Sequence, residues 1–240
     1  MTQAPAARPG IAVIVPVLHD YEAFVALCED LAAQSHQPTQ ILVVDAGADA
    51  RLRDLCEQRN FSYLQSRALR GLQLDKGARA ADSEVLWFVH ADARLPRDAC
   101  AAVADACSSG TAGGCLQFRF QGQRGPMQRL IERLVRLRIA LGGIAYGDQA
   151  LFCTRAAYIT GTGFAHAGLF EEVPFVRSLR AGGGFSPLRV PVYVSRRRWE
   201  RDGWLRRSLR NRWLALRHAC GAAPQSLADV YDGPTPESRQ

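Results

Sequence analysis

Apolar residues along the chain form short continuous runs that alternate with segments of helical periodicity. Continuous runs of this kind are typical of strands buried on both faces of a sheet. They occupy residues 11–17, 40–45, 61–64 and 85–89. Between them, apolar residues recur at the spacing of amphipathic helices, at residues 21–34, 50–58 and 74–81. This alternation predicts an α/β fold, with a mostly parallel central sheet and helices on both faces.

The second half of the chain continues with longer amphipathic segments. We predict helices at residues 96–107, 128–141, 169–181 and 204–218, and strands at residues 113–120 and 189–194. No repeat or linker divides the sequence, so we expect one domain. Its predicted parts are a disordered tail at residues 1–10, two halves at 11–95 and 96–231, and a disordered tail at 232–240.

Two aspartates stand where predicted buried strands end. Asp45 closes the second apolar run, and Asp92 follows the fourth. Ligands of such sheets bind beyond the carboxyl ends of the strands. A carboxylate there suits a hard divalent cation that also binds phosphate oxygens, and one carboxylate is enough when a diphosphate supplies the other ligands. The alternative that the spacing leaves open is that Asp92 caps the helix that opens near Pro96.

Charge and cysteine content narrow the class of protein. The net charge is +7, and Lys76 is the only lysine. An anionic ligand, an anionic membrane surface or solubility alone explains such a balance. Clustered lysines and an aromatic-studded strand motif are lacking, so nucleic acid is the least favoured ligand.

The seven cysteines make an odd count without any Cys-x-x-Cys pair, which favours reduced thiols and a cytoplasmic location. Cys100, Cys107 and Cys115 are better explained as small core residues than as a metal cluster. No apolar run reaches the roughly 18 residues of a membrane-spanning helix.

Several motifs resemble those of the family 2 glycosyltransferases. Three segments look like that family's nucleotide-binding strands: residues 14–17 (Ile-Val-Pro-Val), 43–45 (Val-Val-Asp) and 86–92 (Leu-Trp-Phe-Val-His-Ala-Asp). Arg70, Gln73 and Gly77 resemble the segment before the metal strand. The later motifs follow in the expected order at residues 147–149 (Gly-Asp-Gln), 171–172 (Glu-Glu) and 197–200 (Arg-Arg-Trp-Glu). Together they resemble the small branch often encoded beside radical-SAM and selenium- or arsenic-related genes.

The resemblance implies a GT-A fold, a Rossmann-like nucleotide half followed by an acceptor half on the same sheet. It also implies a nucleotide-sugar donor and Mg²⁺ or Mn²⁺ held by Asp92 against the diphosphate. His90 stands where the wider family has the first acid of an Asp-x-Asp motif. The residues implied for the nucleotide are Pro16, Asp45, Arg70, Asp75 and His90.

Displacing a nucleoside diphosphate requires a base for the acceptor hydroxyl and positive charge for the leaving group. In the family the second acid of the Glu171-Glu172 pair is the base, so Glu172 is preferred. The structural alternative is that both acids favour a helix N-terminus. Asp148 could orient hydroxyls of donor or acceptor, or serve a turn. Arg198 could clamp the diphosphate while Trp199 closes the acceptor pocket.

The sequence leaves three functional hypotheses to be tested. The first is an inverting, metal-dependent glycosyltransferase. The second is a nucleotidyltransferase on a similar fold, disfavoured because residues 18–21 (Leu-His-Asp-Tyr) lack the glycine-rich signature expected after the first strand. The third is a non-catalytic module for an anionic ligand or membrane surface.

The basic helices at residues 128–141 and 204–218 could lie peripherally on a membrane beside a lipid-linked acceptor. For the second of them we prefer the alternative that it packs its apolar side on the core and leaves a solvated basic face.

Overall fold

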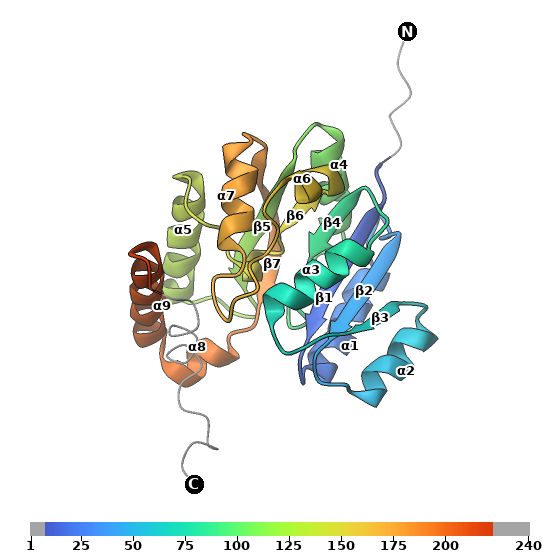
Figure 1. Ribbon diagram of the computed structural model, residues 1–240. Helices are drawn as coiled ribbons and strands as arrows, with labels where there is room; N and C mark the ends of the chain where they lie inside the picture. The colour runs from blue at the N-terminus through green and yellow to red at the C-terminus, as the bar shows by residue number, and fades with distance from the viewer. Residues whose placement is uncertain (1–7, 223–240) are drawn as a thin grey trace.

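A computed structural model describes residues 8–222 of the chain. The first half alternates strand and helix throughout (Figure 1). Its elements are β1 (Ile11–Val17), α1 (Tyr21–Ala32), β2 (Gln40–Asp45), α2 (Ala50–Gln58), β3 (Ser62–Gln65), α3 (Arg70–Ala80) and β4 (Val85–Phe88).

The second half adds three strands to the same sheet. Its elements are α4 (Ala99–Ser108), β5 (Gly113–Phe120), α5 (Pro126–Ala140), the 3-10 helix η1 (Gly147–Gln149), β6 (Phe152–Thr154), α6 (Arg155–Thr160), α7 (Val173–Ala181), β7 (Phe185–Val194), α8 (Arg197–Asp202) and α9 (Trp204–Ala219). In the described part of the chain, no helix combines the length and the apolar character needed to cross a bilayer.

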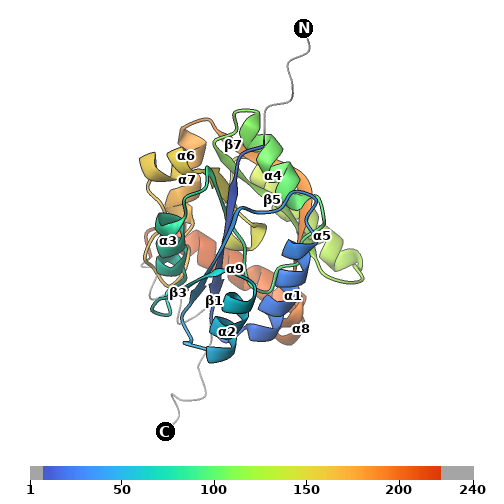
Figure 2. The same cartoon turned by 90° about the vertical axis from the view of Figure 1, so that its right-hand side faces the viewer.

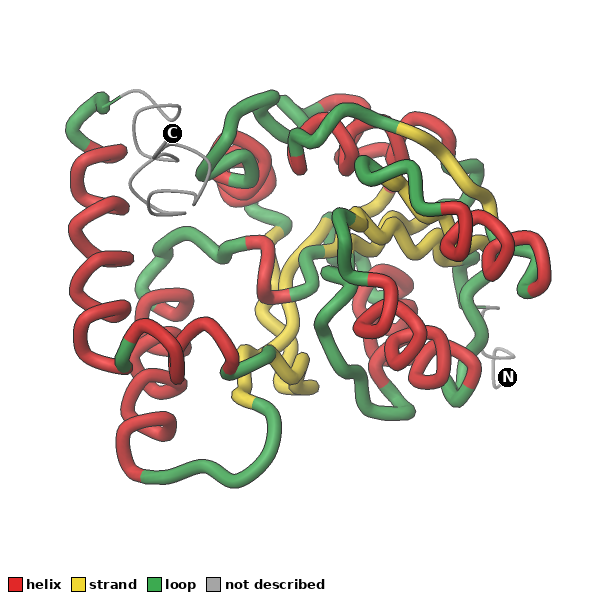
Figure 3. Tube along the Cα trace, turned by 90° about the horizontal axis from the view of Figure 1, so that it is seen from below, coloured by secondary structure: helices red, strands yellow, loops and turns green. Residues whose placement is uncertain are grey.

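The strands form one seven-stranded sheet in the order β3-β2-β1-β4-β6-β5-β7. Every neighbouring pair is parallel except the two that involve β6. Helices cover both faces: α3, α6 and α7 lie on one side, and α1 and α4 on the other (Figure 2). Seen from below, the strands run between these helical layers (Figure 3). The predicted mostly parallel sheet with helices on both faces is confirmed.

A hydrophobic core fills each side of the sheet. Alternate residues of β1 point to opposite faces, because successive side chains of a strand do so. Val13 and Val15 pack with Phe24 and Leu27 of α1, whereas Ile14 packs with the opposite helical layer. All five side chains are fully buried. This two-sided burial explains the continuous apolar run in the sequence.

The structure differs from the predicted elements mainly in the second half. The short elements β6, α6 and α8 were not predicted. α7 begins at Val173, four residues after the predicted start, because Phe170 has a left-handed backbone (φ 61°) that a helix cannot contain. The tail predicted at residues 232–240 and most of the tail predicted at 1–10 lie outside the described residues. Arg8, within the latter range, pairs with Asp105 at 2.7 Å (Nε to Oδ1).

Candidate functional site

The carboxyl ends of β1, β2 and β4 meet at one edge of the sheet. Successive strands are added on one side of β1 up to β3 and on its other side from β4 onward, so β1 and β4 flank a topological switch point where ligands bind. Asp20 follows β1, Asp45 ends β2 and Asp92 follows β4. Because β6 runs antiparallel to β4, η1 with Asp148 comes to the same edge.

Asp92 is half-buried at the end of β4. Burial raises the pKa of its carboxyl group, and the nearby carboxylate of Asp20 raises it further, while Arg198 opposes the shift. Asp92 does not cap the following helix, since α4 begins at Ala99 with Asp98 in the capping position. The capping alternative is therefore wrong, and Asp92 faces other charged groups of the site.

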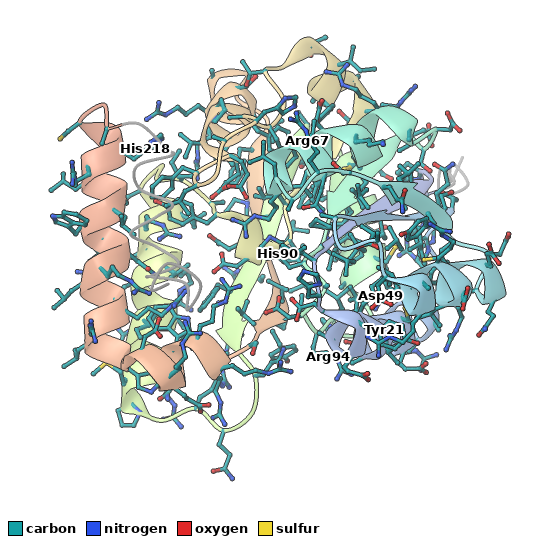
Figure 4. All side chains as sticks on the ribbon, turned by 60° about the horizontal axis from the view of Figure 1, so that its bottom comes forward. Tyr21, Asp49, Arg67, His90, Arg94 and His218 are labelled. Atoms are coloured by element: carbon teal, nitrogen blue, oxygen red, sulfur yellow. The ribbon has the colours of Figure 1, made fainter. Side chains whose placement is uncertain are left out.

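His90 lies two residues before Asp92, near the middle of the molecule (Figure 4). Burial lowers the pKa of its imidazole to about 3, and the positive charges of Arg70 and Arg198 act in the same direction. The ring is therefore neutral near pH 7. A Cβ added to Gly147 would stand 2.9 Å from His90 Nε2, so the ring packs directly against η1. This buried nitrogen has no hydrogen-bond partner among the described residues.

Asp148 lies in η1, whose last residue, Gln149, is held by Tyr146 and by α5. Gln149 Oε1 accepts hydrogen bonds from the Tyr146 amide (3.1 Å) and from Arg138 of α5 (3.2 Å). Burial raises the pKa of the Asp148 carboxyl group, and the charge of Asp92 adds to the shift, whereas Arg138 and Arg70 lower it. Asp148 and Asp92 therefore interact across the edge of the sheet.

Glu171 and Glu172 directly precede α7, and both are buried, with 1% and 4% exposure. Arg70, the first residue of α3, donates its Nε hydrogen to Glu171 Oε1. Burial raises the pKa of Glu172 to about 8, and the negative charges of Glu171 and Asp148 contribute to the rise. Oε2 of each acid has no hydrogen-bond partner among the described residues. The two acids differ instead in that Glu171 is ion-paired with Arg70, whereas no ion pair holds Glu172 within residues 8–222.

The backbone around these acids is tightly fitted. A Cβ on Gly71 would lie 1.9 Å from the Ala165 carbonyl oxygen and 3.0 Å from Glu171 Cβ, so only glycine allows α3 to approach this loop. Phe170, which precedes the acid pair, has a positive φ that is costly for a bulky residue. Ala150, after Asp148, has one too (φ 46°). Strained backbone of this kind clusters at functional sites.

Asp75 lies further along α3 and faces the loop that leads to the acid pair. Its carboxylate accepts hydrogen bonds from Tyr158 Oη at 2.8 Å and from Arg79 Nε at 2.9 Å, and His166 Nε2 lies 3.3 Å away. These contacts join α3 to α6 and to the segment before Phe170. Asp75 thus fixes the loop, and no hydrogen bond or ion pair within residues 8–222 joins it to Asp92.

Asp45 is buried and its carboxylate is already engaged. Oδ1 accepts from the Gly47 amide at 2.7 Å, and Oδ2 accepts from the Asp49 amide at 2.9 Å and from Tyr63 Oη at 2.8 Å. The side chain therefore shapes the loop between β2 and α2. Pro16 lies in β1, half-buried and level with Val44 of β2.

The short helix α8 brings arginines close to this edge of the sheet. Arg198 is exposed and close enough to shift the pKa values of both His90 and Asp92. Arg197 lines a cavity of about 190 Å³ together with His19 and Asp20. Trp199 instead packs its ring against Phe120 and Trp204, with centroids 5.4 Å and 5.7 Å away, and so supports α8 from within. Its predicted role at the acceptor pocket stays a prediction.

The side chains at this edge provide only some of the ligands that a divalent cation needs. Among residues 8–222, no group of three or more His, Cys, Asp or Glu side chains could hold a metal ion by itself. Asp92 faces two other carboxylates, Asp20 and Asp148, and a cation would relieve their repulsion. The side chains present thus fit a divalent cation that takes its other ligands from a diphosphate.

The structure brings together most residues that the sequence singled out, and adds three. Those it brings together form one cluster of ionisable side chains that includes the neutral ring of His90: Glu171, Glu172, Asp148, His90, Asp92, Arg70 and Arg198. Asp45, Asp75, Pro16 and Trp199 lie around it. The sequence analysis missed Asp20, Arg138 and Tyr146. Asp20 could have been found, because it follows the end of β1 as Asp92 follows β4.

Comparisons with known proteins give the family and the fold. A sequence profile described as Glycosyl transferase family 2 matches residues 12–170. No curated protein matches the chain.

Among solved structures, residues 1–349 of TarS from S. aureus match with a TM-score of 0.63 and 16% identity, over 78% of this chain and 60% of that one. The chain thus spans less than two thirds of the TarS fragment. The mannosyltransferase PcManGT from Pyrobaculum calidifontis, in complex with GDP-Man and Mn²⁺, matches with a TM-score of 0.62 and 18% identity, over 92% and 67% of the two chains.

Glucosyl-3-phosphoglycerate synthase from Mycobacterium tuberculosis matches with a TM-score of 0.58 and 15% identity, over 78% of this chain and 71% of that one. These likenesses confirm the predicted GT-A fold.

Proposed function

The chain belongs to glycosyltransferase family 2 and is a glycosyltransferase, and from this premise we propose a metal-dependent, inverting sugar transfer from a nucleotide sugar to an acceptor hydroxyl. The observation that carries the proposal is that three carboxyl groups interact electrostatically, one with the next, across the edge of the sheet. Burial is the main cause of the raised pKa values of Asp148 and Glu172, and the charge of Asp92 adds to the first and that of Asp148 to the second. The three carboxylates therefore share one site, as a reaction between a bound donor and an acceptor requires.

The donor half of the site supplies positive charge. Asp92 would hold Mg²⁺ or Mn²⁺, which when bound stabilises negative charge on the diphosphate. Arg198, exposed beside Asp92, would bind diphosphate oxygens through its guanidinium group. TarS has also been solved in complex with UDP-GlcNAc, and PcManGT with GDP-Man and Mn²⁺, which supports a nucleotide-sugar donor and a divalent cation here.

The acceptor half supplies the base. Glu171 is ion-paired with Arg70, whereas Glu172 has no ion pair among the described residues and burial raises its pKa, so we assign the base to Glu172. The acceptor oxygen attacks the anomeric carbon as the bond from that carbon to the diphosphate breaks. The bonding electrons leave with the diphosphate, and the hydroxyl proton passes to Glu172. A single displacement of this kind inverts the anomeric centre. Asp148 would orient the hydroxyl groups between donor and acceptor.

The remaining predicted residues have supporting roles in this proposal. Asp45 shapes the loop beside the nucleotide, with Pro16 next to it on β1. Asp75 fixes the loop before Glu171 through Tyr158. The neutral imidazole of His90 packs against η1 and keeps a nitrogen for the ligand.

We propose a single catalytic domain with a nucleotide half and an acceptor half. Family membership favours sugar transfer over nucleotidyl transfer and over a non-catalytic module. All seven cysteines are free thiols, and Cys28, Cys56, Cys100, Cys115 and Cys153 are buried, which supports a cytoplasmic location. We include peripheral membrane contact in the proposal. The narrower likeness to the radical-SAM-associated branch stays a prediction.

Donor binding can be tested without knowing the acceptor. Thermal unfolding is measured with UDP or GDP, each with and without Mn²⁺, for the wild type and for Asp92→Asn. The proposal expects at least one nucleotide to raise Tm only when Mn²⁺ is present, and Asp92→Asn to abolish the increase, because ligand binding to the folded state stabilises it. Equal stabilisation of both proteins by nucleotide and Mn²⁺ would remove Asp92 from the cation site.

A further inference from the structure

The helix α5 turns a stripe of leucines to solvent. Leu130, Leu134 and Leu137 lie at helical spacing along one side, and Leu141 directly follows the helix. Their exposed fractions are 51%, 37%, 53% and 77%. The inner side of the helix is held by Ile131 and Ile139, which are buried. The outer stripe is therefore not required for packing within the described part of the chain.

The helix α9 has the same arrangement, opposite to the one we preferred from its sequence. Its inner side contains Leu214, which packs on Leu169 and Phe170, and Arg207, which is buried beside Asp202. Four of its large apolar side chains face outward instead: Leu205 (64% exposed), Leu209 (67%), Trp213 (46%) and Leu216 (64%). Trp204 packs inward against Phe120, with centroids 5.0 Å apart, but the prediction that the apolar side packs on the core is wrong for these four residues. Two neighbouring elements at one end of the molecule thus expose apolar stripes (Figure 1).

Exposed arginines flank both stripes without exposed acids among them. Arg129, Arg133 and Arg136 precede the α5 leucines, and no carboxylate pairs with them within residues 8–222. Together with Arg119 and Arg124 they line a cavity of about 300 Å³ between β5 and α5. On α9, Arg206, Arg212 and Arg217 are exposed.

The acids close to these arginines are already engaged. The only acid of α5, Glu132, is nearly buried and lies 3.2 Å from Arg124. α9 contains no acid, and Asp202, just before it, pairs with Arg207 and Arg210. Each of the two outward sides, which together we call the α5–α9 face, is therefore both apolar and cationic.

We propose that the α5–α9 face docks on a bilayer of anionic phospholipids. Leucine and tryptophan side chains would enter the boundary between headgroups and acyl chains, while the flanking arginines bind lipid phosphates. A second copy of this chain is a poor occupant, because two such faces would bring arginines together without acids to neutralise them. The α5 cavity is lined by five arginines against one carboxylate, Glu132, and so offers a place for a headgroup phosphate.

The α5–α9 face belongs to the acceptor half of the molecule and is linked to the site by direct contacts. Arg138 of α5 contacts Gln149 next to Asp148, and Leu214 of α9 packs on Phe170 next to Glu171. A bilayer on the outer side of these helices would lie on the side of the acceptor half, away from α2 (Figure 1). The inference specifies the peripheral membrane contact of the proposed function, and its test is separate from activity, since binding to lipid does not require sugar transfer.

Flotation with large unilamellar vesicles tests the proposal independently of activity. We expect vesicles of phosphatidylglycerol and phosphatidylcholine to bind the full chain at least about tenfold more tightly than phosphatidylcholine alone, with binding weakened by salt. The variants Leu137→Gln/Leu141→Gln and Leu205→Gln/Leu209→Gln should each reduce this binding about tenfold, because each removes two inserted side chains. The arginine variant Arg129→Gln/Arg133→Gln should also reduce it.

Matched controls keep the test specific. Ile159→Gln replaces an equally exposed side chain (67%) on α6, and Arg97→Gln/Arg189→Gln removes two exposed arginines elsewhere; both should bind as the wild type does. Each of the following results would overturn the proposal: no preference for anionic vesicles, leucine variants that bind normally, controls that lose as much, or displacement by millimolar inorganic phosphate. Sedimentation velocity that shows a dimer dissociated by the leucine variants, without vesicle binding, would assign the face to a second copy.

Discussion

Arg70 donates its Nε hydrogen to Glu171 Oε1 and thereby separates two adjacent carboxylates into different roles. Glu171 is almost fully buried, and its charge is compensated by the guanidinium group. Glu172, next in the chain, is buried and has no ion pair within residues 8–222. In a pair of identical acids, the one with the raised pKa is better suited to take a proton near neutral pH.

The first prediction concerns the base. Glu172→Gln should lower kcat for transfer by about 10²–10⁴-fold, the usual contribution of a positioned general base. In the wild type, kcat should rise with pH through about 8 as Glu172 loses its proton. This limb should be absent from the residual activity of Glu172→Gln. The measurement is a pH profile of kcat.

Glu171→Gln is the matched comparison. It should keep the rising limb, since Glu172 remains, although activity can fall through the loss of the Arg70 contact. A profile in which Glu171→Gln loses the limb and Glu172→Gln keeps it would reverse the assignment.

The second prediction concerns stability and does not require a substrate. The folded pKa of Glu172, about 8, lies above its ordinary value of 4.5. Between these values the folded protein binds the proton more tightly than the unfolded chain does, so the contribution of Glu172 to stability falls as pH rises through this window. Glu172→Gln lacks this loss. Its Tm relative to the wild type should increase from about pH 5 to about pH 9; a constant difference would show that the carboxyl group is not perturbed.

The third prediction uses the ion pair itself. Arg70→Gln leaves the buried carboxylate of Glu171 without its guanidinium partner and should reduce the free energy of unfolding by roughly 2 kcal/mol. In the double variant Arg70→Gln/Glu171→Gln, the uncompensated charge is removed as well, so part of the stability should return. Chemical denaturation of the single and double variants measures the coupling. Additive effects would mean that the two side chains do not interact.

The fourth prediction concerns the approach of α3 to the acid-bearing loop. Gly71→Ala would place a Cβ 1.9 Å from the Ala165 carbonyl oxygen, which forces backbone movement. We expect a loss of about 2–3 kcal/mol of stability together with reduced activity, since Glu171 adjoins the contact. Gly182→Ala is the control, because its Cβ would have only ordinary contacts and its φ is −75°. The two variants should therefore differ clearly in Tm; similar values would contradict the close packing described here.

The sequence predicted the first half of the fold well, for a definite reason. β1, β2 and β4 are buried on both faces, so their apolar runs are continuous and easily recognised. β6 has three residues and α6 has six, too few to show a period. The apolar residues before α7 fit a helical spacing, but the positive φ of Phe170 excludes them from the helix, and φ is not visible in a sequence.

The candidate site was partly predictable by the same reasoning. Asp45 and Asp92 stand out because they end strands, and the family motifs add Asp148 and Glu172. The partners that tune these acids, Arg70 with Glu171 and Asp20 with Asp92, depend on which loops meet in space.

The sequence also did not show that the apolar sides of α5 and α9 face outward. Periodicity shows that a helix has two sides, whereas the structure shows which side packs inward.

The central claim is that Asp92 makes sugar transfer depend on a divalent cation. The most direct measurement is donor hydrolysis or sugar transfer with several nucleotide sugars, titrated with Mn²⁺, for the wild type and Asp92→Ala. The control is Asp82→Ala. Asp82 is exposed and lies between α3 and β4, at the opposite edge of the sheet. We predict that Mn²⁺ activates the wild type and Asp82→Ala, and that Asp92→Ala is about 10²-fold slower and no longer responds to the metal. Identical rates and metal responses for wild type and Asp92→Ala with every donor that reacts would contradict the claim.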